Sequence, residues 1–409
     1  MKGALTPLFA LAVAAACTGT ALPGEPARAD ECCKLNLWTG EGVNLGGILF
    51  PELNYQTVVG SSTTDPESLA VGHHDPNRHG ITQQNIELTL GMRLGEHVRL
   101  FGNYNAVIDH EDHWFSEYEE HYAIISGLPF GAQLKGGRFY TQFGYHNREH
   151  LHDFTFIDKY LASGRLIGED SVSIYGGEIS LPVLRSLPAG WSDRLTFSYG
   201  SVPDPAEEEG EEEGPTAKFE GEGGLWQDWL ATVDYSLLFA ANKTTHYEIG
   251  VSGAWGRNNF DRRTQLYGVH FDYLWRPDGA PAADPDSHKE SAIFLRWRTE
   301  AMVRQVEAVS ESGERGDFTD AGFYSALSYG FPGGKMQAHL RGEYVSGVAE
   351  AGLPERWRVS PALSWRPSAE LPFHFKLQYN YDHSPAFGDE HSVWAQFSLT
   401  WGDCCAHEH

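Results

Sequence analysis

Apolar and polar residues alternate along several stretches of this 409-residue chain. Residues 373–381, Phe-His-Phe-Lys-Leu-Gln-Tyr-Asn-Tyr, place every apolar side chain at an odd position and every polar one at an even position. Because successive side chains of a β-strand point to opposite faces, a strand here has one apolar and one polar face. A similar alternation recurs in residues 86–94, 267–275 and 393–401. The pattern predicts an all-β fold with two chemically different surfaces.

The alternating stretches are rich in Tyr, Trp and Phe and are separated by turns of Gly, Pro and Asp. This combination is typical of a transmembrane β-barrel, whose outward side chains meet lipid while the inward ones line a polar interior. The alternative is a soluble sandwich or lipocalin-like barrel with a buried apolar face. The many strands with aromatic ends favour the membrane protein. We predict a closed, antiparallel, up-and-down transmembrane β-barrel of about 16 strands, without a plug domain.

Composition is consistent with this prediction and narrows the choice of partners. The formal net charge is −26 and the mean hydropathy is −0.40, but alternating strands dilute their apolar half with the polar half. A strongly acidic chain argues against nucleic acid, which requires clustered Lys and Arg. It suits cationic partners, or lipopolysaccharide bridged by divalent ions. Outer-membrane lipid, lipopolysaccharide and divalent metal ions are therefore the expected partners, and a homotrimer is possible.

The N-terminus resembles a secretory signal. Lys2 precedes an apolar run over residues 5–17, and Ala27-Arg28-Ala29 supplies a small-x-small cleavage pattern. A lipoprotein signal ending at Cys17 is the weaker alternative. We predict a signal peptide over residues 1–29, a short periplasmic segment over 30–42, a barrel over 43–401 and a periplasmic tail over 402–409. A cleaved signal and a barrel together predict the bacterial outer membrane.

Strand positions follow from the alternation, and the connections between strands carry a second signal. Short turns at residues 95–96, 129–131, 241–243 and 332–334 alternate with longer polar connections at 60–80, 145–170, 203–223 and 305–320. Short periplasmic turns and long outer loops are characteristic of outer-membrane barrels. The predicted strands begin near Val43, Ile81, His97, Trp114, Ala132, Ser171, Asp193, Leu225, Thr245, Thr264, Glu290, Ala321, Lys335, Glu355, Phe373 and His391.

Charged residues of both signs fall on the predicted inner face of the strands. They either form ion pairs that stiffen the wall or build a charged constriction that selects ions. The sequence leaves both interpretations open. The candidate pore-lining residues are His270, Asp272, Arg296, Arg298, Glu300, Arg341, Glu343, His374 and Lys376.

Histidines are frequent in the predicted outer loops, where carboxylates lie beside them. Imidazole and carboxylate together are a ligand set for Zn²⁺ and related divalent ions. The alternative is solvated polar loops in a protein that is rich in His. Ligands held on loops favour capture of modest affinity over a closed structural site. The candidate ligands are His73, His74, His110, His113, His146, His150 and His152.

Residues 137–158 carry a family resemblance. The order Gly-Arg-Phe, Phe-Gly, Asn-x-x-His-x-His and Phe-x-Asp resembles a segment of proteins described as zinc-regulated outer-membrane receptors. Its first half is also similar to phosphate-selective porins. The resemblance implies a barrel concerned with metal uptake, with His150 and His152 as its most transferable ligands. Residues 151–160 are apolar enough to pack against the inner wall, so the sequence leaves open whether these histidines lie at the rim or at the constriction.

Vicinal cysteines lie near both ends of the predicted mature chain, at Cys32-Cys33 and Cys404-Cys405. Closing a barrel pairs the first strand with the last, which brings these residues near each other in the periplasm. An oxidising compartment favours a disulfide across the seam. The alternative is a thiolate metal site that includes His407 and His409 of the tail.

The sequence therefore predicts an outer-membrane channel or receptor that takes up or captures divalent metal ions, zinc first. One alternative is a general or anion-selective porin for small solutes. A second is a surface binding protein through which nothing crosses. We do not expect an enzyme, because the chain lacks both a Gly-x-Ser-x-Gly elbow and a His-Glu-x-x-His helix.

Overall fold

The computed structural model describes residues 36–38, 44–63, 71–72, 74–77, 79–108, 114–168, 171–184, 186–203, 226–277, 293–310, 313–368 and 371–402. All structural statements below concern these residues. The predicted signal peptide and residues 403–409 of the predicted tail lie outside them.

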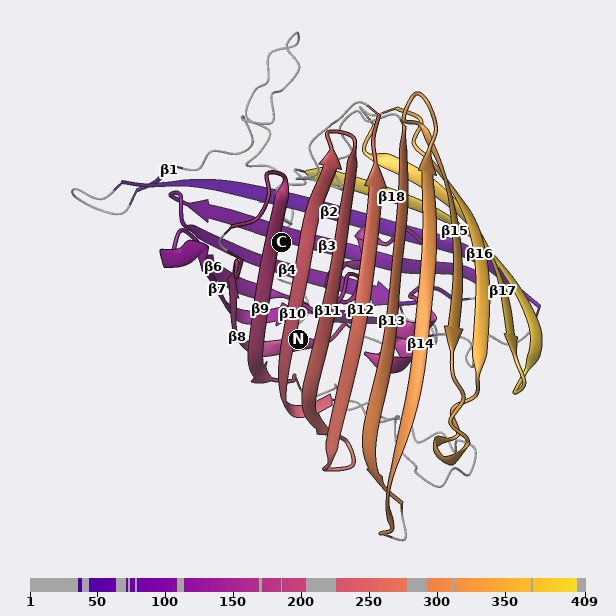
Figure 1. Ribbon diagram of the computed structural model, residues 1–409. Helices are drawn as coiled ribbons and strands as arrows, with labels where there is room; N and C mark the ends of the chain where they lie inside the picture. The colour runs from indigo at the N-terminus through magenta and orange to yellow at the C-terminus, as the bar shows by residue number, and fades with distance from the viewer. Residues whose placement is uncertain are drawn as a thin grey trace, which may run out of the picture.

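Long antiparallel strands form almost all of the described structure (Figure 1). They are β1 (Asn36–Trp38), β2 (Asn44–Ser62), β3 (Gly80–Leu94), β4 (Val98–Ile108), β5 (Trp114–Glu117), β6 (His121–Ile125), β7 (Gln133–Tyr140), β8 (Ser173–Leu181), β9 (Trp191–Ser201), β10 (Trp226–Asn242), β11 (Thr245–Asn258), β12 (Arg263–Trp275), β13 (Phe294–Val309), β14 (Arg315–Gly330), β15 (Met336–Val345), β16 (Arg356–Trp365), β17 (Phe373–Ser384) and β18 (Gly388–Gly402).

The strands close into a barrel because the last pairs with the first long one. β18 runs antiparallel to β2 from Ser392↔Ser62 to Gly402↔Glu52. β5 and β6 both pair with β4, so they form one interrupted wall strand, and the short β1 pairs with the start of β2. The wall is therefore a closed antiparallel barrel of sixteen strands, which confirms the predicted fold class.

Most predicted strand starts lie within three residues of the observed ones, with the largest difference at β14. The predicted loop over residues 305–320 is wrong, because β13 continues to Val309, β14 begins at Arg315, and these two residues pair. In this hairpin the polarity of the two faces is reversed: Val306 and Phe318 are buried, whereas Gln305 is exposed. A hairpin that extends beyond the lipid has water outside, so its outward residues are polar and the alternation no longer resembles a membrane strand.

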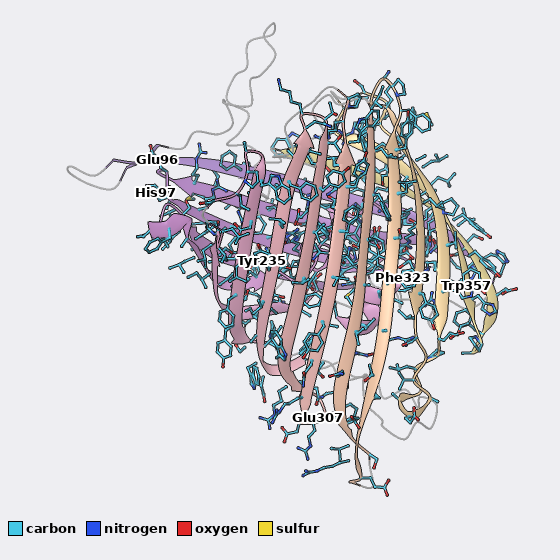
Figure 2. All side chains as sticks on the ribbon, in the orientation of Figure 1. Glu96, His97, Tyr235, Glu307, Phe323 and Trp357 are labelled. Atoms are coloured by element: carbon cyan, nitrogen blue, oxygen red, sulfur yellow. The ribbon has the colours of Figure 1, made fainter. Side chains whose placement is uncertain are left out.

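The distribution of side chains across the wall is the reverse of that in a soluble protein. On β17 the outward Leu377 is 51% exposed, whereas the neighbouring inward Gln378 is fully buried. Outward Val269 on β12 is 54% exposed. Side chains cover both faces of the wall, and the labelled Phe323 belongs to the outward apolar set (Figure 2). An apolar exterior around a polar interior is the arrangement that lipid requires.

This distribution predicts the effect of a charge on the outer face. Leu377 lies near the middle of β17, so Leu377→Arg is expected to destabilise the barrel by about 2–4 kcal/mol if this position lies near the bilayer midplane. The urea midpoint of folded protein in lipid vesicles, followed by heat-modifiable gel mobility, measures the loss. Leu377→Val is the control and should change the midpoint little. An Arg variant as stable as the wild type would show that this face does not meet lipid.

Residues 141–168 and 171–172 belong to the connection between β7 and β8 and fold into the barrel; we call them the inserted segment. They contain the short helices η4 (His146–Arg148), η5 (Leu151–Asp153) and α2 (Leu161–Leu166). In Figure 1 part of this magenta segment is visible behind the front wall, and α2 packs against β13, β14 and β15. The other described helices are η3 (Pro129–Gly131) and η6 (Ala349–Ala351). Among the described residues no helix is long and apolar enough to cross a membrane.

An apolar core inside the barrel explains why the segment turns inward. Phe143, Leu161 and Leu166 of the segment cluster with Leu266 and Met302 of the wall, and all are almost fully buried. Full burial of such a side chain contributes about 1.5–3 kcal/mol. The possibility that the sequence left open is thus decided: His150 and His152 lie within the lumen.

Candidate functional site

Two polar clusters hold the inserted segment against the inner wall. The first, the carboxylate–histidine cluster, joins three histidines to carboxylates of β2, β3 and the β5–β6 region. The second, the arginine cradle, surrounds Asp158 with side chains of β15, β16 and β17. The carboxylate–histidine cluster comprises His74, His150, His152, Glu52, Glu87, Glu117, Glu119 and Glu120, and the arginine cradle comprises Arg341, Arg358, Gln378 and Asn380.

His150 lies between two carboxylates at the break between β5 and β6. Its Nδ1 is 3.0 Å from Glu119 Oε2, and its Nε2 is 2.8 Å from Glu120 Oε2. Burial alone would lower the pKa of His150, but its hydrogen bonds to these two carboxylates outweigh that effect and raise the pKa well above its ordinary value. The ring is therefore an imidazolium that donates from both nitrogens.

His152, two residues further along, also lies between carboxylates. Its Nδ1 is 2.7 Å from Glu87 Oε2, and its Nε2 lies 3.6 Å from Glu52 Oε1 and 3.3 Å from Asp153 Oδ1. Burial opposes protonation, but the charges of Asp153 and Glu87 prevail and raise the pKa of His152 to about 10. The ring also stacks on His150, with centroids 5.8 Å apart.

The carboxylate–histidine cluster also has the composition and spacing of a metal site. In the first of two triads, the ligand atoms of Glu87, Glu119 and His150 all lie within 4.8 Å of one another. In the second, those of His74, Glu117 and Glu119 meet the same limit. One imidazole with two carboxylates is a donor set for zinc and similar divalent ions. Two predicted ligands, His74 and His150, are thus placed beside carboxylates that could share an ion with them.

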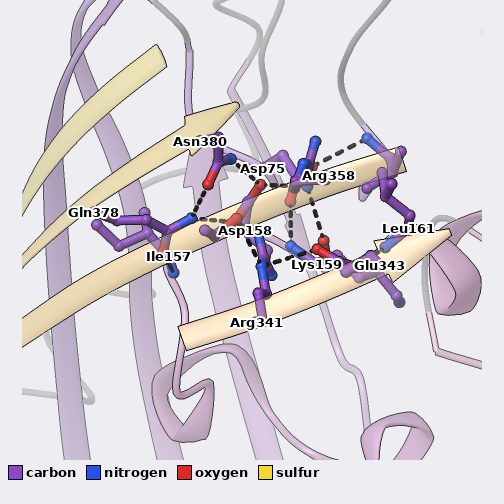
Figure 3. A network of polar contacts seen from close by, with 12 residues as sticks. Asp75, Ile157, Asp158, Lys159, Leu161, Arg341, Glu343, Arg358, Gln378 and Asn380 are labelled. Carbon is purple, nitrogen blue, oxygen red and sulfur yellow. Dashed lines mark hydrogen bonds and ion pairs between the residues drawn. The ribbon is translucent and has the colours of Figure 1, made fainter. Parts of the chain in front are cut away.

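The arginine cradle holds both oxygens of Asp158 (Figure 3). Oδ1 accepts from Gln378 Nε2 at 2.6 Å and from Arg341 Nη2. Oδ2 accepts from Arg358 Nη1 at 2.6 Å and from Asn380 Nδ2 at 2.9 Å. Arg341, Arg358, Gln378 and Asn380 are fully buried, so all four side chains that bind Asp158 are shielded from water.

Further contacts extend the arginine cradle along the wall. Arg358 Nε donates to Asp382 Oδ1 at 2.8 Å, and Arg356 Nε donates to the same oxygen at 3.0 Å. Arg341 is paired with Glu343, whose Oε2 accepts from the backbone N–H of Leu161 at 2.6 Å. The inserted segment is therefore fixed to the wall by side-chain and main-chain bonds.

The middle of the inserted segment is tied to other predicted pore-lining residues. Arg298 pairs with Glu149, Glu300 accepts from the backbone N–H of Tyr145, and Lys376 donates to the carbonyl of Phe154. Asp272 instead pairs with Arg296 across β12 and β13, with Nη2 and Oδ2 2.8 Å apart. His270 on β12 packs edge-on against Tyr145, and His374 shares the inward side of β17 with Lys376. Most of these charges form ion pairs; a role in selecting ions stays a prediction.

His146 differs from the other histidines of the inserted segment. Its ring packs against Phe154 and Tyr160, with centroids 4.5 Å away in both cases, and its Nδ1 is 3.0 Å from Glu149 Oε2. Burial lowers the pKa of His146 to about 4, so the ring is neutral at pH 7. The structure places His146 among aromatic rings, away from the two metal-like triads.

Sequence reasoning missed several residues of both clusters. Glu119 and Glu120 lie where β5 gives way to β6, and an interrupted strand leaves no alternation to follow. Asp158 was part of the family-like motif but was not assigned a role, and Arg358 was passed over. The remaining predicted metal ligands lie outside the described residues: His73, His110, His113, Cys32, Cys33, Cys404, Cys405, His407 and His409.

Solved structures with the same fold are outer-membrane barrels. The channel DcaP of Acinetobacter baumannii is 10% identical, with a TM-score of 0.53 over 90% of this chain and 100% of that chain. OmpF of Salmonella typhi, solved in complex with daunomycin, is 10% identical, with a TM-score of 0.50 over 87% of this chain and 98% of that chain. The trimer form of OmpT from Vibrio cholerae is 9% identical, with a TM-score of 0.50 over 87% and 99%.

Comparisons of sequence add no assignment. No family model and no curated protein matches the chain. Identities of 9–10% to these three solved structures show a shared fold alone. The chain therefore has the fold of outer-membrane porin-type β-barrels, and the resemblance to zinc-regulated receptors stays a prediction.

Proposed function

We propose that this protein is a bacterial outer-membrane channel for small solutes, in which the inserted segment sets the size of the passage. The observation that carries the proposal is a polar, charged lumen inside an apolar wall, with a loop anchored across it. Gln378 and Asn380 on one part of the wall and Glu87 on another are fully buried beneath the inserted segment. Their full burial leaves little open space at that level, so the proposed passage would admit small solutes more readily than large ones.

Reconstitution tests this proposal directly. Purified protein in planar bilayers should give ohmic single-channel currents in potassium chloride, and liposomes that contain it should swell with small neutral sugars faster than with oligosaccharides. Empty liposomes and a protein-free bilayer are the controls. A protein that carries neither ions nor sugars, even when the inserted segment has been released by substitution, would contradict a channel and favour a surface binding protein.

A second candidate function is capture or uptake of divalent metal ions, zinc first. The two triads that share Glu119 are the specific observation in its favour. A metal ion here would replace the protons that His150 now carries, so its affinity should rise with pH. The ion would be the transported or captured substrate, held between wall and segment.

Zinc binding by calorimetry at pH 7 and pH 8 tests this second function. Glu119→Gln removes a carboxylate from both triads, and we expect the affinity for zinc to fall by at least about tenfold. Substitution of a residue that only hydrogen-bonds to a metal ligand already lowers metal affinity by about 10–100-fold. His383→Gln changes an exposed histidine outside the carboxylate–histidine cluster and is the matched control. Equal zinc binding by both variants would exclude the cluster as the metal site.

Self-association into a homotrimer is also proposed, with a specific face. β7 has 8 residues, fewer than the roughly 9–11 that a membrane strand needs, and β6 contributes only 5 to the interrupted wall strand that it forms with β5. Their outer surface carries polar groups, because Arg138 lies over the ring of outward Tyr175 and His121 packs against the same ring. A second copy of the chain would cover the outer surface of these short strands better than lipid would. Light scattering of detergent-solubilised protein measures the mass, and Arg138→Glu should lower it if this face is the contact.

A further inference from the structure

The arginine cradle has the form of a ligand site whose ligand is supplied by the chain itself. We propose that it is a binding site for the carboxylate of a small solute, and that Asp158 occupies it in place of that solute. The inference rests on the proposed channel and names the class of solute that such a channel would prefer. When Asp158 withdraws, a free carboxylate takes its position.

The donors of the arginine cradle belong to the wall and not to the inserted segment. Arg341 comes from β15, Arg358 from β16, and Gln378 and Asn380 from β17. Together they give each carboxylate oxygen two side-chain hydrogen bonds, one from a guanidinium and one from an amide. Such planar recognition by guanidinium groups is how proteins bind free carboxylates. The wall would therefore retain a complete set of donors after the inserted segment had moved.

Charge balance requires an anion at this position. The guanidinium groups of Arg341, Arg356 and Arg358 face three carboxylates, those of Asp158, Asp382 and Glu343. The nearby Asp75 accepts instead from the backbone N–H groups of Lys159 and Val71, at 2.8 Å and 3.0 Å. Without Asp158 the three guanidinium groups would face only two of their carboxylates, Asp382 and Glu343. A buried unpaired charge is costly, so one monovalent carboxylate would restore the balance.

A donor without a partner supplies an independent sign of a ligand. Within the described part of the chain, Arg358 Nη2 is buried and makes no hydrogen bond, although Nη1 and Nε of the same group are both engaged. Asp158 can offer only two oxygens, and both are used. A small carboxylate with a second acceptor, such as a hydroxy acid or a dicarboxylate, could also reach Nη2. The site therefore favours small carboxylates that carry a second acceptor over monocarboxylates that lack one.

Calorimetry on the full-length protein in detergent tests the proposal without depending on transport. Asp158→Asn keeps the shape of the residue but removes the charge, so the tethered group competes poorly for the arginine cradle. We expect this variant to bind succinate and lactate at least about tenfold more tightly than the wild type does. Asp158→Asn combined with Arg358→Gln should lose that gain. Acetate should bind more weakly than lactate, and inorganic phosphate more weakly than succinate.

Several outcomes would overturn the inference. One is an Asp158→Asn variant that binds carboxylates no better than the wild type. Another is equal binding by the single and the double variant, and a third is stronger binding of phosphate than of succinate. Heat-modifiable mobility confirms that each variant is folded before the titration. A protein that passes no solute in bilayers but gains succinate binding in Asp158→Asn would contradict the proposed channel and leave the carboxylate site intact, so the two failures are distinguishable.

Discussion

Asp158→Asn protein is expected to conduct several-fold more current than the wild type in planar bilayers. The substitution removes the negative charge to which Arg341 and Arg358 are bound, both of which are fully buried. Removing one partner of a buried ion pair costs about 3–5 kcal/mol, because the other charge is left uncompensated. That cost can be relieved if this part of the inserted segment leaves the wall and water enters the arginine cradle. The passage then widens.

A matched control separates widening of the passage from a mere change of charge in the lumen. Asp272→Asn removes the same charge from an ion pair with Arg296, and in that pair both partners lie on the wall. Its conductance should stay close to that of the wild type. Protease cleavage within the segment should increase in Asp158→Asn alone. If both variants conduct alike, or if neither is cleaved faster, the arginine cradle is not the anchor that limits conductance.

Raising the pH through 10 is expected to release the part of the inserted segment around His152 and increase the conductance. Burial lowers the pKa of His152, but Asp153 and Glu87 outweigh it and raise the pKa from 6.5 to about 10. Because the pKa is higher in the attached state than in the released state, protonation stabilises the attached state fully below about pH 6.5. That stabilisation declines as the pH rises and is lost above about pH 10.

His152→Gln is the control for this pH dependence. Its neutral amide can still donate to Glu87 but does not titrate, so the rise in conductance between pH 7 and pH 11 should be much smaller than in the wild type. His150, whose pKa is also raised, stacks on His152 and accounts for the rise in conductance that remains in the variant. Single-channel conductance measured in steps of one pH unit provides the comparison. Identical pH profiles for both proteins would show that His152 does not hold the segment.

Much of the fold could be predicted from the sequence because a membrane wall imposes its chemistry on every strand. The stretch at residues 373–381 identifies β17 (Phe373–Ser384) to the residue at its start, since lipid on one side and polar groups on the other enforce the alternation. The prediction failed at β14, where the hairpin leaves the membrane and the polarity of its faces reverses. It also missed the break between β5 and β6, which is too short to produce a pattern.

The candidate site was predictable only in part. His150 and His152 were singled out by their spacing and their resemblance, and Arg341 by its parity within a strand. Their partners Glu119 and Asp158 could not be paired with them, because the bonds join residues up to 183 positions apart. Such pairs depend on how the barrel closes and on where the inserted segment lies. The local sequence pattern contains no information about either.

Strict alternation by itself determined that this protein is a lipid-facing barrel with a polar interior, because the period of two is a local property of the strand and each residue reports its own environment. Only the tertiary structure decided what fills that interior. The inward turn of the inserted segment, the imidazolium between Glu119 and Glu120, and the carboxylate held by Arg341 and Arg358 all arise from contacts across the lumen. Their physical basis is burial: inside the barrel, charges taken from water must find partners wherever the fold places them.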